Sequence, residues 1–194
     1  ITEAETPEDK QEIQRIIQEN NGRLLHLVNE LLDFSKIEAN MVKYDIQPIG
    51  VNELLKTVYN SFILRCPSEV QLINESLDTE HYVVADKNRT VQVISNLIDN
   101  ALKYTKSGSI RLGYELKDEY IEIYTADTGV GIFPERLDSI FNRFVKADEN
   151  VQGTGLGLSI CKMLIEKMGG QISVESEYGK GTTFKVTFPV LKKE

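Results

Sequence analysis

Apolar residues in the first forty positions recur at the spacing of a helix that packs along other helices. From Glu8 to Glu38 the sequence has no proline and a single glycine, so nothing interrupts a helix there. The apolar positions advance in alternating steps of four and three, with Asn20 filling one place, and a second apolar row widens the stripe. These positions are Ile13, Ile17, Leu24, Leu27, Leu31 and Phe34, with Ile16, Leu25, Val28 and Leu32 beside them. The pattern predicts one long helix of a four-helix bundle.

After residue 41 the pattern changes to short strands and helices. Strands are predicted at 42–48, 70–74, 82–85, 109–116, 120–126, 171–176 and 182–189, and helices at 51–64, 88–104, 135–141 and 156–168. Asp86 is placed to cap the second helix, and Gly169 and Gly170 to end the last. Because strands and helices do not alternate strictly, the pattern favours an α+β two-layer sandwich, a mixed sheet covered by about three helices. We therefore divide the chain into residues 1–41 and residues 42–194.

Composition narrows the class of protein and of partner. The 194 residues carry a net charge of −8, so we expect no nucleic-acid partner, and any bound phosphate needs local cations and backbone dipoles. No apolar run has the length of a membrane span, and the first residues lack the layout of a signal peptide. The isolated cysteines, Cys66 and Cys161, are expected to be free, buried or partly buried thiols in a reducing compartment.

Three short motifs in a fixed order carry the chemistry. NLIDNALKYT at 96–105 offers two amide side chains, Asn96 and Asn100, one turn apart on a helix. DTGVGI at 127–132 offers a carboxylate followed by glycines, which let a ligand approach the backbone. GTGLGLSICK at 153–162 sets three glycines before an apolar helix, whose free N–H groups attract an anion. Together the motifs predict a site for a nucleoside triphosphate.

Other glycine motifs do not fit these spacings. A dinucleotide fingerprint starting at Gly153 needs its third glycine at position 158, where the chain has leucine. A Walker loop around Gly179 would need a glycine in place of Val174 and a serine or threonine in place of Gly181. A turn between two strands explains this second segment better.

The motifs resemble those of a known family. NLIDNALKYT, DTGVGI, IFNRFVK at 140–146 and GTGLGLSICK are similar to the N, first glycine, F and second glycine boxes of bacterial sensor histidine kinases. LLDFSKIEA at 31–39 resembles the end of the second helix in that family's dimerisation and phosphoacceptor hairpin. The resemblance implies that residues 1–41 hold this second helix. Residues 42–194 would be the catalytic ATP-binding domain, with the fold shared by DNA gyrase and related ATPases.

The resemblance assigns roles to the first two motifs. Asp127 is expected to accept a hydrogen bond from the adenine amino group, and Gly129 and Gly131 to form the floor under the base. Asn100 is expected to ligate Mg²⁺ through its amide oxygen, a hard donor for a hard cation. Asn96 would act as a catalytic residue that orients metal-bound water.

Further positions are expected to contact the phosphates. Lys103 would neutralise phosphate charge and Tyr104 would pack near the nucleotide. Lys146, where the family often has arginine, would act on the γ-phosphate; lysine keeps the charge but loses the bidentate fork, and a solvated lid lysine is the alternative. The start of the last helix would wrap the triphosphate. The residues expected to bind there are Gly153, Gly155, Leu156 and Gly157.

Three residues are expected to support the site. Thr182 matches the family's glycine–threonine pair before the final strand, and the resemblance implies that it supports the adenine end. Phe141 and Phe144 match the F box, where aromatic packing in the lid is the expected role.

The family's phosphoacceptor histidine lies in a motif resembling SHEIRTPL, which these 194 residues do not contain. Neither His26 nor His81 has the acidic neighbour or the R-T-P-L tail of that motif. We therefore expect the chain to bind ATP and Mg²⁺ and to transfer the γ-phosphoryl group to a histidine on a helix absent from it, without phosphorylating itself.

Two alternatives stay open. A hydrolytic ATPase of the gyrase-like group would use a glutamate general base where this chain has Asn96, which cannot take a proton from water. A non-catalytic nucleotide-sensing or dimerisation module is the other, and the complete set of nucleotide motifs argues against it.

The resemblance also implies partners and a location. The chain would form a homodimer through residues 8–38 and would act with a response regulator receiver domain. It would belong to the cytoplasmic portion of a membrane-bound sensor kinase.

Overall fold

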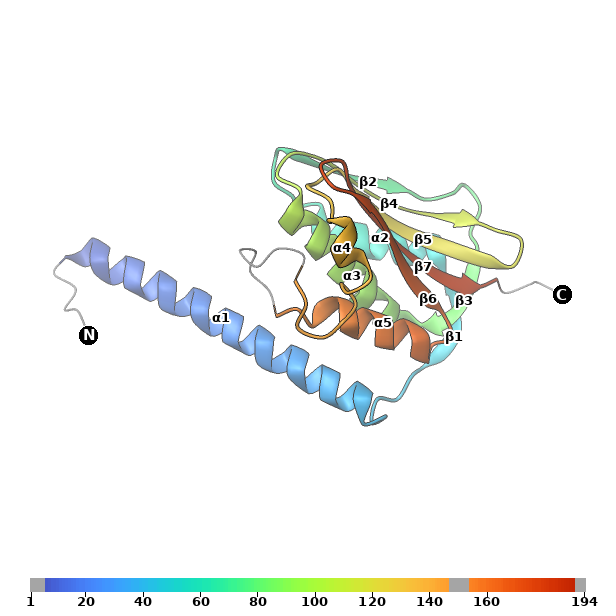
Figure 1. Ribbon diagram of the computed structural model, residues 1–194, viewed down its shortest axis with the longest axis horizontal. Coiled ribbons are helices and arrows are strands. Elements are labelled where there is room, and N and C mark those ends of the chain that lie inside the picture. Colours follow the sequence, from blue (N-terminus) through green and yellow to red (C-terminus); the bar gives the residue numbers. More distant parts are fainter. Residues whose placement is uncertain (1–5, 147–153, 191–194) are drawn as a thin grey trace. The chain divides into compact units, whose positions relative to one another are not determined.

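The computed structural model describes residues 6–146 and 154–190 and divides into two compact units, Ile1–Met41 and Val42–Glu194. The first unit is one long helix, α1 (Pro7–Glu38), drawn in blue in Figure 1. It covers the range predicted from the apolar periodicity. Most of its apolar stripe is exposed in the single chain, with relative exposures of 53% for Ile17 and 60% for Leu24.

A five-stranded mixed sheet forms one layer of the second unit (Figure 1). Its strands, in spatial order, are β2 (Val70–Glu75), β4 (Gly108–Leu116), β5 (Tyr120–Asp127), β7 (Gly181–Pro189) and β6 (Gln171–Glu177). β2 runs parallel to β4, and the other neighbouring pairs are antiparallel. A tight hairpin turn joins β4 to β5, and in it the Lys117 N–H donates to the Tyr120 carbonyl at 2.9 Å.

Three helices cover one face of this sheet: α2 (Val51–Phe62), α3 (Lys87–Tyr104) and α5 (Gly157–Lys167) (Figure 1). The strands alternate between a buried face and a polar face, as period-two side chains do. On β7 the alternate residues Phe184, Val186 and Phe188 are buried. Burial of apolar residues between the two layers confirms the predicted α+β sandwich.

Two local features differ from the sequence prediction. β1 (Ile46–Gly50) and β3 (Tyr82–Asp86) pair with each other in a separate antiparallel two-stranded sheet, a pairing that the pattern did not reveal. The helix expected at 135–141 is only the single turn α4 (Pro134–Leu137). Beyond it, the N–H groups of Ser139 and Asn142 bond to carbonyls three residues earlier, which is turn geometry.

α3 carries the amide side chains of the first motif, and its start is firmly fixed. Asp86 caps it as predicted: its carboxylate accepts the Arg89 N–H at 3.0 Å and also the Asp45 N–H at 2.9 Å. The spacing of apolar residues along this helix predicts a buried Val91, but Val93 is buried instead. Val91 is only half-buried.

The end of α5 and the state of the cysteines agree with the sequence prediction. Gly169 has a φ of +78°, and the N–H of Gly170 bonds to the Ile165 carbonyl at 3.0 Å, so these glycines end the helix. Cys66 is half-buried and Cys161 is buried, both as free thiols. Within the described residues, no helix combines the length and apolar character needed to cross a bilayer.

Candidate functional site

The predicted site residues fall into two groups, which we call the carboxylate end (Asp127, Gly129 and Thr182) and the amide end (Asn96, Asn100 and Gly157). Asp127 is the last residue of β5, and side-chain alternation turns it toward the helix layer. Its carboxylate accepts the Gly129 N–H at 2.8 Å. The N–H of Thr182, its partner on β7, bonds to the same carboxylate.

Burial raises the pKa of the Asp127 carboxyl above its ordinary value. The N–H groups of Gly129 and Thr182 and the Thr105 hydroxyl oppose this shift in its pKa. A carboxylate that is partly desolvated and surrounded by donors is a strong and well-oriented acceptor for a ligand N–H.

Glycines shape the loop that follows Asp127. A Cβ on Gly129 would lie 2.4 Å from the Tyr104 carbonyl oxygen and 2.8 Å from Asp127 Oδ1, so no side chain fits there. Gly131 has a φ of +70°, and a Cβ on it would lie 2.2 Å from the Glu177 carbonyl oxygen. The Val130 N–H between them bonds to the Tyr104 carbonyl at 3.2 Å. The loop is therefore held against the end of α3 on one side and β6 on the other.

Sequence reasoning missed Ser176, which links this loop to β7. Its hydroxyl oxygen accepts the Ile132 N–H at 2.8 Å and its proton goes to the Gly181 carbonyl at 2.8 Å. The Thr182 hydroxyl, 3.0 Å from Ser176 Oγ, then donates to it. Thr182 thus bonds to the Asp127 carboxylate through its backbone N–H, while its hydroxyl proton bonds to Ser176 Oγ. A lone serine on a strand gives no signal in the sequence that could have revealed this.

At the amide end, two side chains of α3 bond to each other. Asn100 Nδ2 donates to Asn96 Oδ1 at 3.2 Å, so the amide oxygen of Asn100 faces away from this bond. A Cβ on Gly157 would lie 2.7 Å from Asn96 Nδ2, which is why the first residue of α5 has no side chain. The motifs at 96–105 and 153–162 are therefore in contact, as the sequence prediction required.

α3 also carries the residues between the two ends. From Asn96 to Tyr104 the helix axis rises about 12 Å, a separation that an extended nucleoside triphosphate can bridge. Lys103 is exposed, and the described residues give its ammonium no ion-pair partner. Tyr104 is half-buried, and its carbonyl anchors the glycine loop.

The F-box residues differ from one another. Phe141 is half-buried and packs edge-to-face on Phe184, with ring centroids 6.3 Å apart, as expected. Phe144 does not pack as expected: it is 67% exposed and has a φ of +62°. Its backbone N–H bonds to the Gly155 carbonyl at 2.9 Å, so its contribution here is made through the main chain.

Of the remaining predicted residues, Leu156 directly precedes α5 and Lys146 ends the F-box segment. Leu156 is 2% exposed and its N–H bonds to Thr154 Oγ1 at 3.0 Å, so its side chain belongs to the core. Lys146 is half-buried, and its carbonyl accepts a hydrogen bond from Arg136 Nη1 at 2.8 Å. Gly153 lies outside the described residues.

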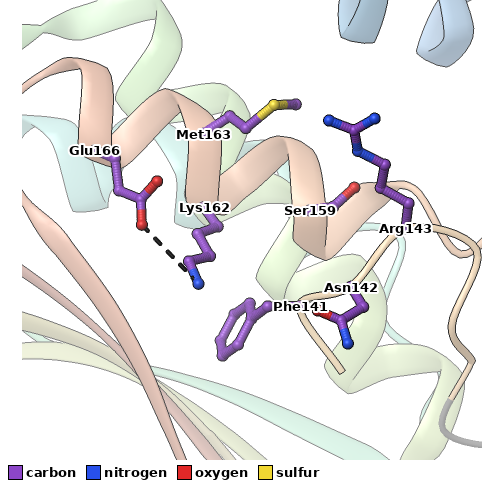
Figure 2. A pocket seen from close by; sticks show the side chains of 7 residues that line it. All are labelled: Phe141, Asn142, Arg143, Ser159, Lys162, Met163 and Glu166. Atoms are coloured by element: carbon purple, nitrogen blue, oxygen red, sulfur yellow. Dashed lines mark ion pairs between the residues drawn. The ribbon is translucent and has the colours of Figure 1, made fainter. Parts of the chain in front are cut away.

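A separate open pocket of about 440 Å³ lies between the F-box segment and the outer side of α5 (Figure 2). Lys162 and Glu166 of α5 point toward the Phe141 ring, and the Lys162 ammonium lies 6.0 Å from the centre of that ring. Of the site residues predicted from the motifs, only Phe141 of the F-box segment lines this pocket. The pocket is therefore not the site predicted from the motifs.

Comparison with known proteins decides the family. The model of the histidine kinase-, DNA gyrase B- and HSP90-like ATPases matches residues 85–192, which include every residue of the carboxylate and amide ends. The chain belongs to this family. It contains the ATP-binding catalytic domain found in sensor histidine kinases, which confirms the fold and the kind of domain inferred from the motifs.

Individual relatives of this ATPase domain are sensor kinases. The autoinducer 2 sensor kinase/phosphatase LuxQ of Vibrio parahaemolyticus is 35% identical over 202 residues, which cover 98% of this chain and 23% of LuxQ. Full-length ShkA in complex with AMPPNP superposes with a TM-score of 0.84 and 29% identity, over 97% of this chain and 40% of that one. The histidine kinase ThkA in complex with the response regulator TrrA gives a TM-score of 0.79 and 27% identity, over 98% and 54%. The chain thus spans less than a quarter of the length of LuxQ.

Proposed function

We propose that this chain binds ATP with Mg²⁺ and donates the γ-phosphoryl group to a histidine carried by a partner helix. The observation that carries the proposal is the Asn100–Asn96 hydrogen bond, which uses the amide nitrogen of Asn100 and leaves its amide oxygen outside this bond. That oxygen lies on the same helix whose end meets the half-buried Asp127 carboxylate. The helix α3 therefore carries an oxygen ligand for a metal ion, on Asn100, and its end lies beside a hydrogen-bond acceptor for a base, on Asp127.

At the carboxylate end, Asp127 accepts a hydrogen bond from the adenine amino group. Gly129 and Gly131 form the floor under the base, because without a Cβ the loop can lie directly against the Tyr104 and Glu177 carbonyls. Thr182 holds the carboxylate in place through its N–H. The purine is thus bound by groups that the fold orients before the ligand arrives.

At the amide end, Asn100 ligates Mg²⁺ and Asn96 orients a water molecule bound to it. The ion, when bound with the nucleotide, neutralises charge that builds up on the phosphates. Among the described residues no three histidine, cysteine, aspartate or glutamate side chains gather as a metal cage. An amide oxygen together with phosphate oxygens suits Mg²⁺, which usually keeps several waters and few protein ligands.

The remaining residues bind and position the phosphates. Lys103 and Lys146 supply positive charge that the chain as a whole lacks, and Lys146 acts on the γ-phosphate. Gly155 and Gly157 bring the N–H groups at the start of α5 close to the phosphate chain. Gly153, Leu156 and Tyr104 contribute backbone or ring contacts to the same nucleotide.

The phosphoryl group passes to a histidine on a helix of the phosphoacceptor hairpin. Residues 1–41 supply the second helix of that hairpin, and the exposed apolar stripe of α1 forms a homodimer through residues 8–38. A response regulator receives the group in turn, a partner class suggested by the ThkA–TrrA complex. Asn96 supports transfer over hydrolysis, because an amide cannot act as the general base for an attacking water. The whole protein acts in the cytoplasm as part of a membrane-bound sensor.

The test is phosphoryl transfer between two polypeptides. The chain is incubated with γ-labelled ATP and Mg²⁺, with and without a separate helical hairpin that carries an H-box histidine. We expect acid-labile label on the added hairpin and none on His26 or His81. Label on this chain alone, or release of inorganic phosphate at a comparable rate without the hairpin, would contradict the proposal.

A further inference from the structure

Thr105 carries a buried hydroxyl group that meets no described atom at hydrogen-bond geometry, although it lies near the Asp127 carboxyl. It follows the last residue of α3 and is 2% exposed. Its N–H ends the helix by bonding to the Ala101 carbonyl at 2.9 Å. Among the described residues, Thr105 Oγ1 finds no atom with hydrogen-bond geometry. Buried hydroxyl groups nearly always have a partner, so an exception of this kind points to a ligand or an ordered water.

This hydroxyl faces the carboxylate end of the nucleotide site. Thr105 Oγ1 and Asp127 Oδ1 both lie 2.8 Å from the point that a Cβ on Gly129 would occupy. The Tyr104 carbonyl oxygen lies 2.4 Å from the same point. These three oxygen atoms therefore surround one small space, which only a glycine at position 129 leaves open. The hydroxyl is close enough to Asp127 to oppose the rise in the pKa of its carboxyl.

We propose that Thr105 is a specificity-determining residue of the nucleotide site, whose hydroxyl joins Asp127 in binding the amino-bearing edge of adenine, directly or through one water molecule. The inference rests on the proposed function and adds a residue to it. Thr105 lies outside the set of binding residues predicted from the motifs.

The chemistry of the purine edge explains why a hydroxyl is needed beside a carboxylate. Adenine presents an amino donor next to a ring-nitrogen acceptor, whereas guanine presents a carbonyl acceptor next to a ring N–H donor. Asp127 alone accepts, and a hydroxyl both donates and accepts. Asp127 and Thr105 together match the adenine pattern, and a site built around polar groups rejects a base that leaves them unpaired.

Thr182 cannot take this role, although it lies opposite Asp127 on β7. Its hydroxyl proton is directed to Ser176 Oγ, which has given its own proton to the Gly181 carbonyl. The Thr105 proton has no such partner among the described residues. Thr105 is therefore the hydroxyl beside Asp127 whose proton is available to a ligand.

A matched control exists on β5. Thr125 lies two residues before Asp127 on the same face of the strand, is 1% exposed and also has a hydroxyl without a partner among the described residues. It pairs with Leu112 and Phe184 inside the sheet, away from the glycine loop. Thr105→Val and Thr125→Val each replace one buried hydroxyl with a methyl group of the same shape, and Thr105→Ser keeps the hydroxyl.

The experiment measures dissociation constants for ATP and GTP by calorimetry on the whole chain and on the three variants, over a series of pH values. For Thr105→Val we expect about tenfold weaker ATP binding and little change for GTP, so the ratio of the two constants falls. Its loss of affinity on acidification should begin at a higher pH, because the Asp127 carboxyl loses a neighbouring hydroxyl group that holds its pKa down. Thr105→Ser and Thr125→Val should keep the wild-type ratio, and Thr105→Val should unfold at a temperature no lower than the wild type does.

An unchanged ATP-to-GTP ratio in Thr105→Val would overturn the inference. So would an equal loss in Thr125→Val, which would show a general response to a core change, or a failure of Thr105→Ser to keep the ratio. Should Thr105→Val not fold, Thr105→Ala provides the same comparison. Wild-type chain that binds no ATP would overturn the proposed function together with this inference, whereas normal ATP binding by Thr105→Val would overturn the inference alone.

Discussion

The two ends of the nucleotide site are built on different physical terms. At the carboxylate end, backbone N–H groups and the Ser176 hydroxyl hold Asp127 and the glycine loop, so most polar atoms are fixed by the sheet. At the amide end, the contacts are made by side chains: one hydrogen bond joins Asn100 to Asn96, and Lys103 is exposed. The polar groups of the first end are thus held by several hydrogen bonds within the fold, whereas the described residues give the side chains of the second end fewer such bonds.

This difference suits the two tasks of a phosphoryl donor. Recognition of a flat base gains from pre-oriented acceptors, because little entropy is lost when the base binds. Phosphoryl transfer changes the charge and geometry of the phosphates as it proceeds, so its supporting groups must follow that change. Variants at each end should therefore affect different measurements, binding at one end and transfer at the other.

Asn100→Ala should produce the largest effect. Loss of the amide oxygen removes the Mg²⁺ ligand, and phosphoryl transfer should fall by about 100-fold or more. Nucleotide binding measured with the metal chelated should change little, because the carboxylate end is intact. Asn60→Ala, on the exposed side of α2, is the control. Equal losses in transfer and in metal-free binding would erase the distinction between the two ends.

Asp127→Asn should weaken nucleotide binding by tens of fold. The amide keeps the shape of the side chain but removes the charged acceptor, at a cost of about 2–3 kcal/mol. Calorimetry gives the dissociation constant, and Asp138→Asn, at the exposed end of α4, serves as the control. An unchanged constant would remove Asp127 from base recognition and leave the carboxylate end without a function.

Ser176→Ala should lower the free energy of unfolding by about 1–3 kcal/mol, because it leaves the Ile132 N–H and the Gly181 carbonyl unpaired. The test is urea unfolding, with Ser173→Ala on the exposed side of β6 as the control. ATP affinity should decrease with the stability, since the glycine loop loses its attachment. Equal stability of both variants would mean that the loop is held in another way.

Acidification should weaken ATP binding by only a few-fold, the smallest of these effects. Burial raises the pKa of the Asp127 carboxyl in the free chain, and an adenine amino group that donates to the carboxylate lowers that pKa again. Binding therefore releases a proton, and affinity falls as the pH drops through the raised pKa of the free chain. Calorimetry in buffers of different ionisation enthalpy measures this proton. Asp127→Asn should remove the dependence, and its persistence there would assign it to another group.

Much of the fold could be read from local patterns. The heptad stripe predicted α1, alternation predicted the strands, and Asp86 and Gly169 marked helix ends, because each of these signals acts between residues close in sequence. Two boundaries were misjudged where local signals were weak: the strand expected at 42–48 is Ile46–Gly50, and the helix expected at 135–141 ends at Leu137. Phe144 looked like a packed aromatic, but its positive φ and its main-chain bond to Gly155 leave its ring exposed.

The sequence by itself determined the three nucleotide motifs, their order and the elements that carry them, since spacing within a motif sets which side chains share a helix face or precede a turn. Only the tertiary structure decided that the Gly157 backbone packs against Asn96 and that Ser176 links the glycine loop to β7. It also decided that the Thr105 hydroxyl is buried beside Asp127. These contacts join residues between 22 and 61 positions apart or lie across a sheet, and no periodicity in the chain encodes which distant atoms will meet.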